Sequence, residues 1–379
     1  MKRFLYPVGI SLILQLPQSC TFISPEVETI PDLDSEVNKI MTENQIPSIA
    51  ACIVKDDSIV WQHYYGYADY DNRTVAQSET IFELASVSKL VVATAVMQLS
   101  ERGLIDLNSD VSSYLPFRVR NPHHPEHEIT PLHLLTHTSG LAWPTDEDGI
   151  PGFYDNYSLD SAPPMDKWLP QYVLTSGTWY RTAVWKNTIP GERELYSNLG
   201  IALLAYLVER VSGSDFNSYC RKNIFEPLEM KNTSYDFSDL VMKNVARIYT
   251  ENYTAIGYDR QLAFPTADLK STLQDFSRLV IAYMNDGQYR TARILSKKTI
   301  DEMLTMHNPA SGRCLIWDCD LGNWYGHSGG MPGVSTHVEF QRDAKVGVLI
   351  FSNKRNKLVY PGTRIHGLIR REANKNVGK

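Results

Sequence analysis

The sequence predicts an α+β fold in which an antiparallel sheet is built from both ends of the chain and flanked by helices, with a mainly helical second lobe inserted between them. Two observations carry this prediction. β-rich runs separated by turn residues occur near the start of the chain, at 48–65, and again near its end, at 334–351. Between these hairpins, apolar residues recur mostly at helical spacing. With 379 residues, 43% of them hydrophobic, the chain can bury one large core or two smaller ones.

Residues 1–20 have the pattern of an export signal. A positively charged start precedes an apolar stretch over 4–16, which is too short for a comfortable membrane span. Cys20 resembles the lipidated cysteine of a bacterial lipoprotein, although Pro17 and Gln18 fit that pattern poorly. We expect an exported protein that is either cleaved near this point and periplasmic, or tethered to a membrane as a lipoprotein through Cys20.

The first folded elements after this signal are a helix and a hairpin. Asp34 can cap a helix whose apolar residues recur at helical spacing, and Pro47 ends it. Two β-rich runs follow at 48–54 and 59–65, separated by a turn-like segment at 55–58. We therefore expect a β-hairpin directly after the first helix.

The middle of the chain is mainly helical. The strongest pattern runs over 86–102, and Gly103 is placed to end that helix. Proline is favoured in the first turn of a helix, so 130–131 predicts the start of another. Two more helices are predicted at 198–211 and 272–285.

A long segment with little periodicity, 142–190, interrupts these helices. Loops of this length in a compact domain usually form a lid or wall of a functional site. We expect its aromatic residues to form an apolar wall that selects acyl groups by shape, with packing inside the lobe as the alternative. The segment holds four of the seven tryptophans, Trp143, Trp168, Trp179 and Trp185.

The end of the chain repeats the combination of hairpin and helix. β-rich runs at 334–341 and 346–351 flank a turn at 342–345, and 363–371 has helical apolar spacing. We expect residues 33–370 to form a single domain with a sheet lobe and a helical lobe.

Charge and cysteine content exclude several classes of protein. Lys and Arg number 37 against 43 Asp and Glu, and no extended basic run occurs, so we expect no nucleic-acid partner. The four cysteines after Cys20 are too few for a disulfide scaffold and lack a zinc-binding spacing. Cys314 and Cys319 could pair in an oxidising compartment, whereas Cys52 is expected to be buried in a strand rather than nucleophilic.

Ser86 and Lys89 form the first candidate catalytic pair. Three residues make almost one helical turn, so both side chains lie on one face at the start of the strongest helix. A serine becomes nucleophilic when a base is within hydrogen-bonding reach, and a lysine desolvated in a cleft can be that base. The helix N-terminus adds N–H groups where an oxyanion would form. Ser88 lies on the opposite side of the helix and is therefore not preferred.

Tyr196 and Asn198 place a phenol and a carboxamide on one side of a short turn before the next helix. A phenolate held near cations can share the general-base role, and an amide can donate to and accept from a bound acyl group. Tyr-x-Asn also occurs at three other places in the chain, so position, not the triplet, favours this one.

A glycine-rich segment directly precedes the C-terminal hairpin. Its glycines, Gly329 and Gly330 among them, let a substrate backbone approach closely, and the Gly330 N–H can be a second oxyanion donor. His327 and Ser328 offer polar contacts to a substrate carboxylate. The alternative is a glycine-rich strand entry with a surface histidine.

Serine-x-x-lysine, tyrosine-x-asparagine and basic residue-x-glycine, in this order, resemble the motifs of the serine β-lactamase and penicillin-binding protein family. The likeness is closest to the branch that holds class C β-lactamases, D-alanyl-D-alanine carboxypeptidases and esterases. It covers about residues 33–370, and the stretches that strengthen it are 82–89, 129–141, 225–230 and 327–333.

The resemblance implies a β-lactamase/transpeptidase-like fold and a covalent acyl-enzyme, with no cofactor and no metal. It leaves open which member of the acid/base pair is the principal base. The implied roles are nucleophile for Ser86, acid and base for Lys89 and Tyr196, substrate amide contact for Asn198, cleft lining for His327, Ser328 and Gly329, and oxyanion hole for the N–H groups of Ser86 and Gly330.

The first residue of the third motif departs from the class C pattern, which begins with lysine. His327 stands in its place, as in carboxypeptidase, aminopeptidase and esterase relatives. A histidine near its ordinary pKa is only partly charged at neutral pH, so efficient β-lactamase activity is in doubt. In addition, Asp268 stands where many relatives have glycine, a departure that we expect not to touch the chemistry.

Two rival sites are weaker. Residues 326–330 also satisfy Gly-x-Ser-x-Gly, and Asp343 and His366 follow in the order of an α/β-hydrolase triad, but Pro332 and then a strand follow instead of a helix. A second cluster lacks the helical His-Glu-x-x-His spacing of a metal site and is expected to be a polar loop; its residues are His123, His124, Glu126, His127 and Glu128.

The sequence therefore predicts a serine hydrolase that acts through an acyl-enzyme on a peptide, ester or lactam carbonyl of a small-molecule or peptide substrate. We expect an enzyme of the D-peptidase, carboxypeptidase or esterase type. The alternatives are a β-lactamase proper and a penicillin-binding sensor or scaffold with little turnover, which could retain both Ser86 and Lys89. The sequence does not fix the oligomeric state.

Overall fold

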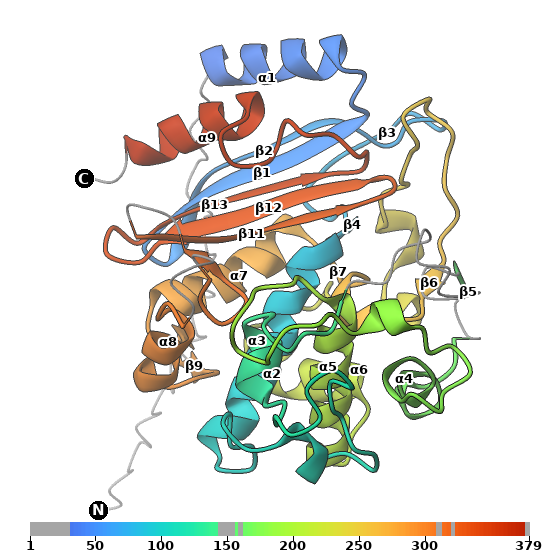
Figure 1. Cartoon of the computed structure of the whole chain (residues 1–379). Coiled ribbons are helices and arrows are strands. Elements are labelled where there is room, and N and C mark those ends of the chain that lie inside the picture. Colours follow the sequence, from blue (N-terminus) through green and yellow to red (C-terminus); the bar gives the residue numbers. More distant parts are fainter. Residues whose placement is uncertain (1–30, 143–155, 158–161, 308–312, 320–322, 376–379) are drawn as a thin grey trace, which may run out of the picture.

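A computed structural model of the chain describes residues 31–142, 156–157, 162–307, 313–319 and 323–375. Its main feature is a seven-stranded antiparallel sheet with the order β10-β11-β12-β13-β1-β2-β3 (Figure 1). The strands are β1 (Ser48–Lys55), β2 (Ser58–Asp69), β3 (Thr74–Val75), β10 (Asp318–Cys319), β11 (Trp324–Met331), β12 (Val334–Gln341) and β13 (Val346–Ser352). The predicted signal at 1–20 lies outside the described residues.

The two ends of the chain meet at the centre of this sheet, as the sequence predicted. β1 pairs with β13 in a register that runs from Ile49 opposite Ser352 to Lys55 opposite Val346. Every residue of β13, and every residue of β1 except Lys55, is buried, because helices cover both faces of the sheet. Their near-continuous apolar sequences reflect this double burial.

One face of the sheet is covered by helices from both termini. These are α1 (Pro31–Glu43) and α9 (Arg364–Asn374), which contact each other above the sheet (Figure 1). Helix α1 begins three residues before the expected cap at Asp34, whose carboxylate instead accepts a hydrogen bond from the Tyr65 hydroxyl at 2.7 Å. A separate apolar cluster, which includes Val37, fills the space between these helices and the strands.

The other face carries α7 (Leu273–Met284) and the helical lobe (Figure 1). At the centre of that lobe, α2 (Lys89–Glu101) packs against α5 (Asn198–Ser212). All residues of α2 from Lys89 to Leu99 are buried, so this helix is enclosed on every side and has no solvent-facing stripe over that range. The remaining helices are α3 (Pro131–Leu135), α4 (Met165–Val173), α6 (Phe216–Cys220) and α8 (Lys297–Met303).

Short strand pairs and a disulfide complete the fold. The pairs are β4 (Phe82–Glu83) with β7 (Lys270–Ser271), β5 (Asn156–Tyr157) with β6 (Arg260–Gln261), and β8 (Gln288–Tyr289) with β9 (Ala292–Arg293). Cys314 and Cys319 form a disulfide, and Cys52 is buried in β1. Within the described ranges, no helix has both the length and the apolar character that crossing a membrane requires.

The described tryptophans of the segment 142–190 pack inside or against the helical lobe, which is the alternative to the predicted wall. Trp168 and Trp185 are buried in the core of the helical lobe, and the Trp185 indole N–H donates to the carbonyl of Val173 at 3.1 Å. Trp179 is partly exposed and packs against Tyr172, with 5.2 Å between ring centroids. For these three rings the wall is not observed, because the segment contains an amphipathic helix, α4, whose buried apolar face includes Trp168. Trp143 lies outside the described residues.

Candidate active site

Ser86 lies in a 3₁₀ turn, Ala85–Ser88, that leads directly into α2. Ala85 adopts a left-handed conformation with φ of +48°, which bends the chain sharply between β4 and this turn. Ser86 is only 8% exposed and Lys89 is fully buried. The sequence predicted this pairing on one helical face, and the structure confirms it.

The Lys89 amine has two close neighbours. Its Nζ lies 2.9 Å from Ser86 Oγ and 2.8 Å from the carbonyl oxygen of Thr266. Burial, together with the positive charge of Arg313, lowers the pKa of Lys89 well below its ordinary value. The neutral amine can therefore take the proton of the Ser86 hydroxyl at moderate pH.

Tyr196, which lies directly before α5, contacts the same serine. Its hydroxyl is hydrogen-bonded to Ser86, and Lys89 Nζ lies 5.1 Å from the centre of its ring. Burial raises the pKa of Tyr196 above its ordinary value, so the phenol keeps its proton at neutral pH. These opposite directions favour Lys89 as the base and Tyr196 as the proton donor.

His137 supports this tyrosine and was not singled out from the sequence. Its ring lies 4.4 Å from that of Tyr196, and its Nδ1 accepts the backbone N–H of Ser197 at 3.2 Å. Burial, with the nearby positive charge of Arg313, lowers the pKa of His137 well below its ordinary value. A neutral His137 therefore packs against the proton donor at a tilt of 35° between the rings.

Arg313 is a second residue that sequence reasoning missed. Its guanidinium lies 5.8 Å from the centre of the Tyr196 ring. Two carboxylates hold it, Glu194 at 2.6 Å and Asp318 at 2.7 Å. It directly precedes the disulfide between Cys314 and Cys319. No local pattern points to this residue, because its approach to Tyr196 joins segments more than a hundred residues apart.

β11 packs directly against the turn that carries the serine. A Cβ atom on Gly329 would lie 2.4 Å from the carbonyl oxygen of Leu84 and 3.1 Å from the backbone nitrogen of Ser86. Only glycine permits this approach. Thr336 on the neighbouring strand donates a hydrogen bond to the same Leu84 carbonyl at 2.7 Å. The third motif and the serine are thereby brought together, as predicted.

His327 lies in this interface but is not the partly charged group that the sequence predicted. It is 3% exposed, and its Nδ1 donates to the carbonyl of Ser328 at 2.8 Å. Burial, then the charges of Lys89 and Arg313, lowers its pKa well below the ordinary value, so the ring is neutral at neutral pH. Its Nε2 is buried and has no hydrogen-bond partner among the described residues.

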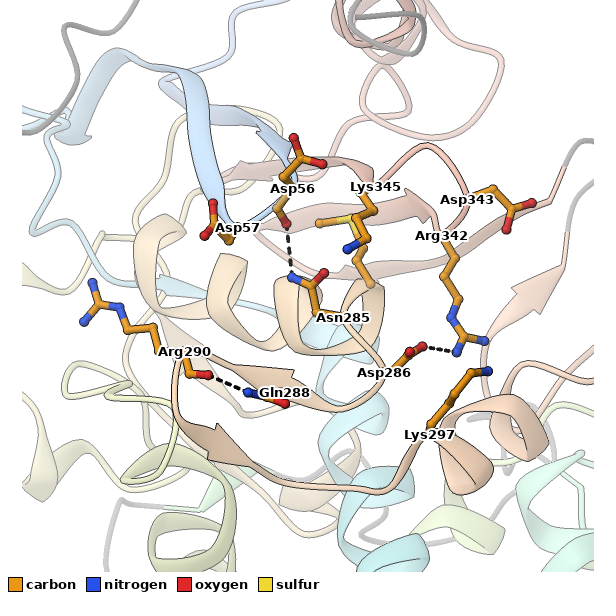
Figure 2. A pocket seen from close by; sticks show the side chains of 11 residues that line it. Asp56, Asp57, Asn285, Asp286, Gln288, Arg290, Lys297, Arg342, Asp343 and Lys345 are labelled. Carbon is orange, nitrogen blue, oxygen red and sulfur yellow. Dashed lines mark hydrogen bonds and ion pairs between the residues drawn. The ribbon is translucent and has the colours of Figure 1, made fainter.

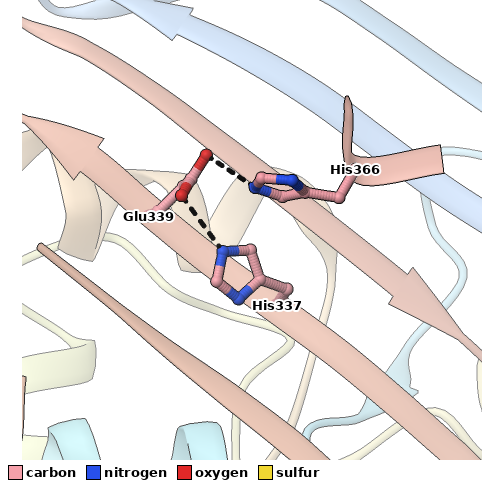
Figure 3. Close-up of side chains that lie close together, drawn as sticks. All are labelled: His337, Glu339 and His366. Carbon is pink, nitrogen blue, oxygen red and sulfur yellow. Dashed lines mark hydrogen bonds and ion pairs between the residues drawn. The ribbon is translucent and has the colours of Figure 1, made fainter. Parts of the chain in front are cut away.

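The Ser328 side chain does not line the cleft as predicted. Successive residues of a strand point to opposite faces, and Ser328 points to the face that α9 covers. Its hydroxyl lies 3.0 Å from Nδ1 of His337 on β12. Figure 3 shows the group that continues from there, with Glu339 between the rings of His337 and His366.

This His337–Glu339–His366 group is the one triplet of possible metal ligands found within the described residues. Its hydrogen bonds do not fit a metal site. Nδ1 of His366 accepts the N–H of Gly362, so its Nε2 carries a hydrogen, which it donates to Glu339 at 2.9 Å. The Arg370 guanidinium, 3.4 Å from Glu339, supplies a further positive charge. We interpret the group as a hydrogen-bonded cluster that stabilises the Glu339 carboxylate.

Asn198 is the first residue of α5 and is buried. Its side-chain oxygen has no hydrogen-bond partner within the described part of the chain. A buried amide oxygen without a partner is costly, which is consistent with a substrate donor filling that place. Its role as a substrate amide contact stays a prediction.

A wide cavity of about 790 Å³ lies away from this site, where the turns that follow β1 and β12 face the segment from the end of α7 to the start of α8 (Figure 2). Its charges are largely satisfied internally, since Arg342 bridges Asp286 and Asp301. It contains none of the predicted site residues.

The two rival sites fail in the structure. Residues 326–330 lie inside β11, which turns into β12 and not into a helix, so they cannot form a nucleophile elbow. His366 belongs to the Glu339 cluster. The histidine-rich segment is a loop in which His124 lies 2.9 Å from Asn187 and His127 lies 3.3 Å from Glu126.

Comparison with known proteins identifies the family. A sequence model described as Beta-lactamase matches residues 33–367. The chain belongs to the beta-lactamase family.

Two relatives match most of the chain. PbpX of Bacillus subtilis (strain 168) is 26% identical over 335 residues, which are 85% of this chain and 75% of PbpX. Protein flp of Staphylococcus aureus (strain MW2) is 23% identical over 86% of this chain, but the match spans only 64% of flp.

Solved structures show the same fold. The octameric penicillin-binding protein homologue from Pyrococcus abyssi is 25% identical with a TM-score of 0.74, and the likeness covers 92% of this chain and 77% of that one. The D-alanine carboxypeptidase AmpC from Burkholderia cenocepacia is 20% identical with a TM-score of 0.66 over 91% of this chain and 98% of that one. The fold is therefore β-lactamase/transpeptidase-like.

Proposed function

We propose that this protein hydrolyses peptide or ester bonds through a covalent acyl-enzyme on Ser86. The observation that carries the proposal is the placement of a buried amine of lowered pKa, Lys89, 2.9 Å from the Ser86 hydroxyl. Tyr196, a phenol of raised pKa, contacts the same hydroxyl. A base and a proton donor thus meet at one nucleophile, which is the arrangement that acyl transfer requires.

The reaction proceeds in two balanced steps. Lys89 takes the Ser86 proton as Oγ attacks the carbonyl, and the N–H groups of Ser86 and Gly330 stabilise the oxyanion. Tyr196 donates its proton to the leaving group as the bond to it breaks, and the Lys89 ammonium returns a proton to the phenolate. Water then attacks the acyl-enzyme by the same route in reverse, and the acid product leaves.

The charges around Ser86 favour a peptide or ester over a lactam. His327 is neutral, where the class C pattern has a permanently charged lysine. Arg313 is already held by Glu194 and Asp318. A β-lactam that needs a strong cation for its carboxylate therefore finds a weaker partner here. We rank a D-peptidase or esterase activity first. A carboxypeptidase substrate also carries a carboxylate, so this argument ranks carboxypeptidase activity no higher than β-lactamase activity, and both stand above a non-hydrolytic penicillin sensor.

A panel of purified-protein assays tests this ranking. D-amino-acid peptides, short-chain esters and nitrocefin are each incubated with the native chain and with Ser86→Ala. We expect sustained, Ser86-dependent turnover of a peptide or an ester, and slower turnover of nitrocefin. Stoichiometric labelling of Ser86 without turnover of any substrate would favour the sensor, and fastest turnover of nitrocefin would favour a β-lactamase.

We also propose that residues 1–20 direct export. Lipidation of Cys20 would anchor the exported protein to a membrane, whereas cleavage without lipidation would leave it in the periplasm. The charged start and apolar stretch support the export signal, and Cys20 supports the lipid anchor. Mass spectrometry of the mature N-terminus and membrane fractionation of Cys20→Ser test both parts. An unprocessed N-terminus in the cytosol of an exporting bacterial host would contradict the proposal.

A further inference from the structure

A small cavity of about 70 Å³ lies beside the end of β11, next to the proposed site. Three carboxylates line it, those of Glu83, Asp259 and Asp268. Each belongs to a different segment, and Glu83 lies only three residues before Ser86. The space is enough for an ammonium group with part of an alkyl stem.

The Glu83 carboxylate is the unexplained group in this cavity. Glu83 is 7% exposed, and within the described ranges its side chain has neither a hydrogen bond nor an ion pair. Lys270 is near enough to lower the Glu83 pKa, yet its ammonium donates to the carbonyl of Tyr235 at 3.0 Å and lies 3.9 Å from the Phe237 ring centre. A buried carboxylate without a hydrogen-bond donor is costly, so its cavity calls for one.

Asp268 does not fill that need. Its carboxylate accepts the backbone N–H of Gln261 at 2.7 Å and cannot donate when ionised. It also adds negative potential beside Glu83, because Asp268 is one of the charges that raise the Glu83 pKa. The departure from glycine at position 268 therefore does bear on the site, by making this cavity more acidic.

The direction of β11 places the cavity on the acyl side of the substrate. The leaving group must lie near its proton donor, Tyr196, whose ring centre is 6.4 Å from that of His327. From His327 the strand runs past Gly330, the proposed oxyanion donor, to Met331, which lines the cavity. These four residue steps span about 13 Å. The part of the substrate that stays on Ser86 extends toward the cavity.

We propose that this cavity is a subsite for a positively charged amine on the acyl group of the substrate. Glu83 and Asp259 would accept hydrogen bonds from the ammonium, and Ile248, Ile256 and Met331 would contact its alkyl stem. The inference rests on the proposed function, because the acyl side is defined by the acyl-enzyme on Ser86. It narrows the substrate class to aminoacyl donors, with the amine on or beyond the acyl α-carbon.

The charge of Glu83 makes this preference depend on pH. Burial raises the pKa of Glu83 to about 7, with Asp268 and Asp259 acting in the same direction and Lys270 against them. An ammonium binds the ionised carboxylate, so the preference for a cationic acyl group falls as the pH drops below about 7. The titration of Lys89 and Tyr196 changes kcat/KM for both substrates alike, so its effect cancels in the ratio of the two kcat/KM values on the same enzyme.

Matched esters test the subsite on the full chain. Glycyl, β-alanyl and 6-aminohexanoyl p-nitrophenyl esters are compared with propanoyl, butanoyl and heptanoyl esters, in which a methyl group replaces the ammonium. For at least one length we expect kcat/KM to favour the amine by about tenfold, the value of a charge-assisted hydrogen bond. Glu83→Gln and Asp259→Asn should each reduce that ratio. Asp57→Asn, an exposed acid at the far turn of the β1 hairpin, should leave it unchanged.

Asp259 keeps the test decisive if Glu83→Gln does not fold, because Asp259 is exposed. Ser86-dependent hydrolysis of the neutral esters without an amine preference at any length would overturn the subsite and leave the proposed function standing. A preference that survives both substitutions would also overturn it. If Ser86→Ala hydrolyses all six esters as fast as the native chain, the proposed function fails and the subsite fails with it.

Discussion

The Ser328 hydroxyl lies 3.0 Å from Nδ1 of His337, on the face of the sheet turned away from Ser86. The side chains of the third motif, residues 327–330, therefore lie on both faces of the sheet. His327 and Gly329 face the serine, whereas Ser328 joins the hydrogen-bonded cluster of Glu339 beneath α9. The side chains on the two faces have different effects on activity and stability.

Ser328→Ala should leave catalysis nearly intact. We expect kcat/KM to change by less than about threefold, and the free energy of unfolding to fall by about 1 kcal/mol as His337 loses a hydrogen bond. Ser86→Ala should reduce kcat by about 10³-fold or more. Steady-state kinetics and urea unfolding of both variants check this. An acyl adduct found on Ser328 by mass spectrometry would contradict the assignment of the nucleophile.

Lys89→Met should abolish turnover and stabilise the fold. The folded chain binds the Lys89 proton more weakly than the unfolded chain, because burial lowers its pKa. The free energy of unfolding of the native chain therefore rises with pH between the lowered pKa of Lys89 in the folded chain and its pKa of about 10.4 in the unfolded chain. Lys89→Met lacks this pH dependence.

The advantage of Lys89→Met should thus be largest at acid pH and shrink as the pH rises. Urea midpoints of both proteins across this range give the difference, and the other titrating groups cancel. Parallel curves would show that Lys89 keeps an ordinary pKa in the folded chain.

We expect that His327 does not raise kcat/KM for carboxylate-bearing substrates as the pH falls from 8 to 6. Its lowered pKa keeps the ring neutral over this range, so no positive charge develops. The measurement is the kcat/KM ratio of a carboxylate substrate to its methyl ester, which should stay flat. A ratio that rises toward pH 6 in the native chain but not in His327→Asn would mean that His327 does become protonated.

Trp185→Ala should cost stability without changing acyl-chain selectivity. Its indole is fully buried and hydrogen-bonded, so we expect a loss of about 3–5 kcal/mol. Trp179→Ala is the matched control, because that ring is only partly buried and should cost less. Thermal melting and a series of ester chain lengths separate the two effects. A shifted chain-length preference in Trp185→Ala would restore the predicted wall.

The elements that the sequence predicted well are those with a local signal. Both hairpins and the helices at 86–102, 198–211 and 272–285 follow from apolar spacing and caps, and the structure places them within a few residues. The bend at Ala85 shows the limit of such reasoning, because nothing in the residue itself indicates a positive φ.

The features that the sequence could not show depend on burial and on contacts between distant segments. The charge state of His327 follows first from its burial and then from the nearness of Lys89 and Arg313, which only the folded chain brings about. Arg313 has no motif of its own. Glu83 could be placed next to the serine from sequence, but not the cavity that it lines.

The pairing of β1 with β13 has a consequence for biosynthesis. The two strands lie next to each other in the sheet, yet Ile49 meets Ser352 only after some three hundred intervening residues have been made. A ribosome-bound chain can therefore form the helical lobe early, but β1 and β2 wait as an open edge until the last tenth of the protein emerges. Newly made protein should thus pass through a long-lived, partly folded state that chaperones protect from aggregation. A chain truncated within β13 should be degraded and should not accumulate with partial activity.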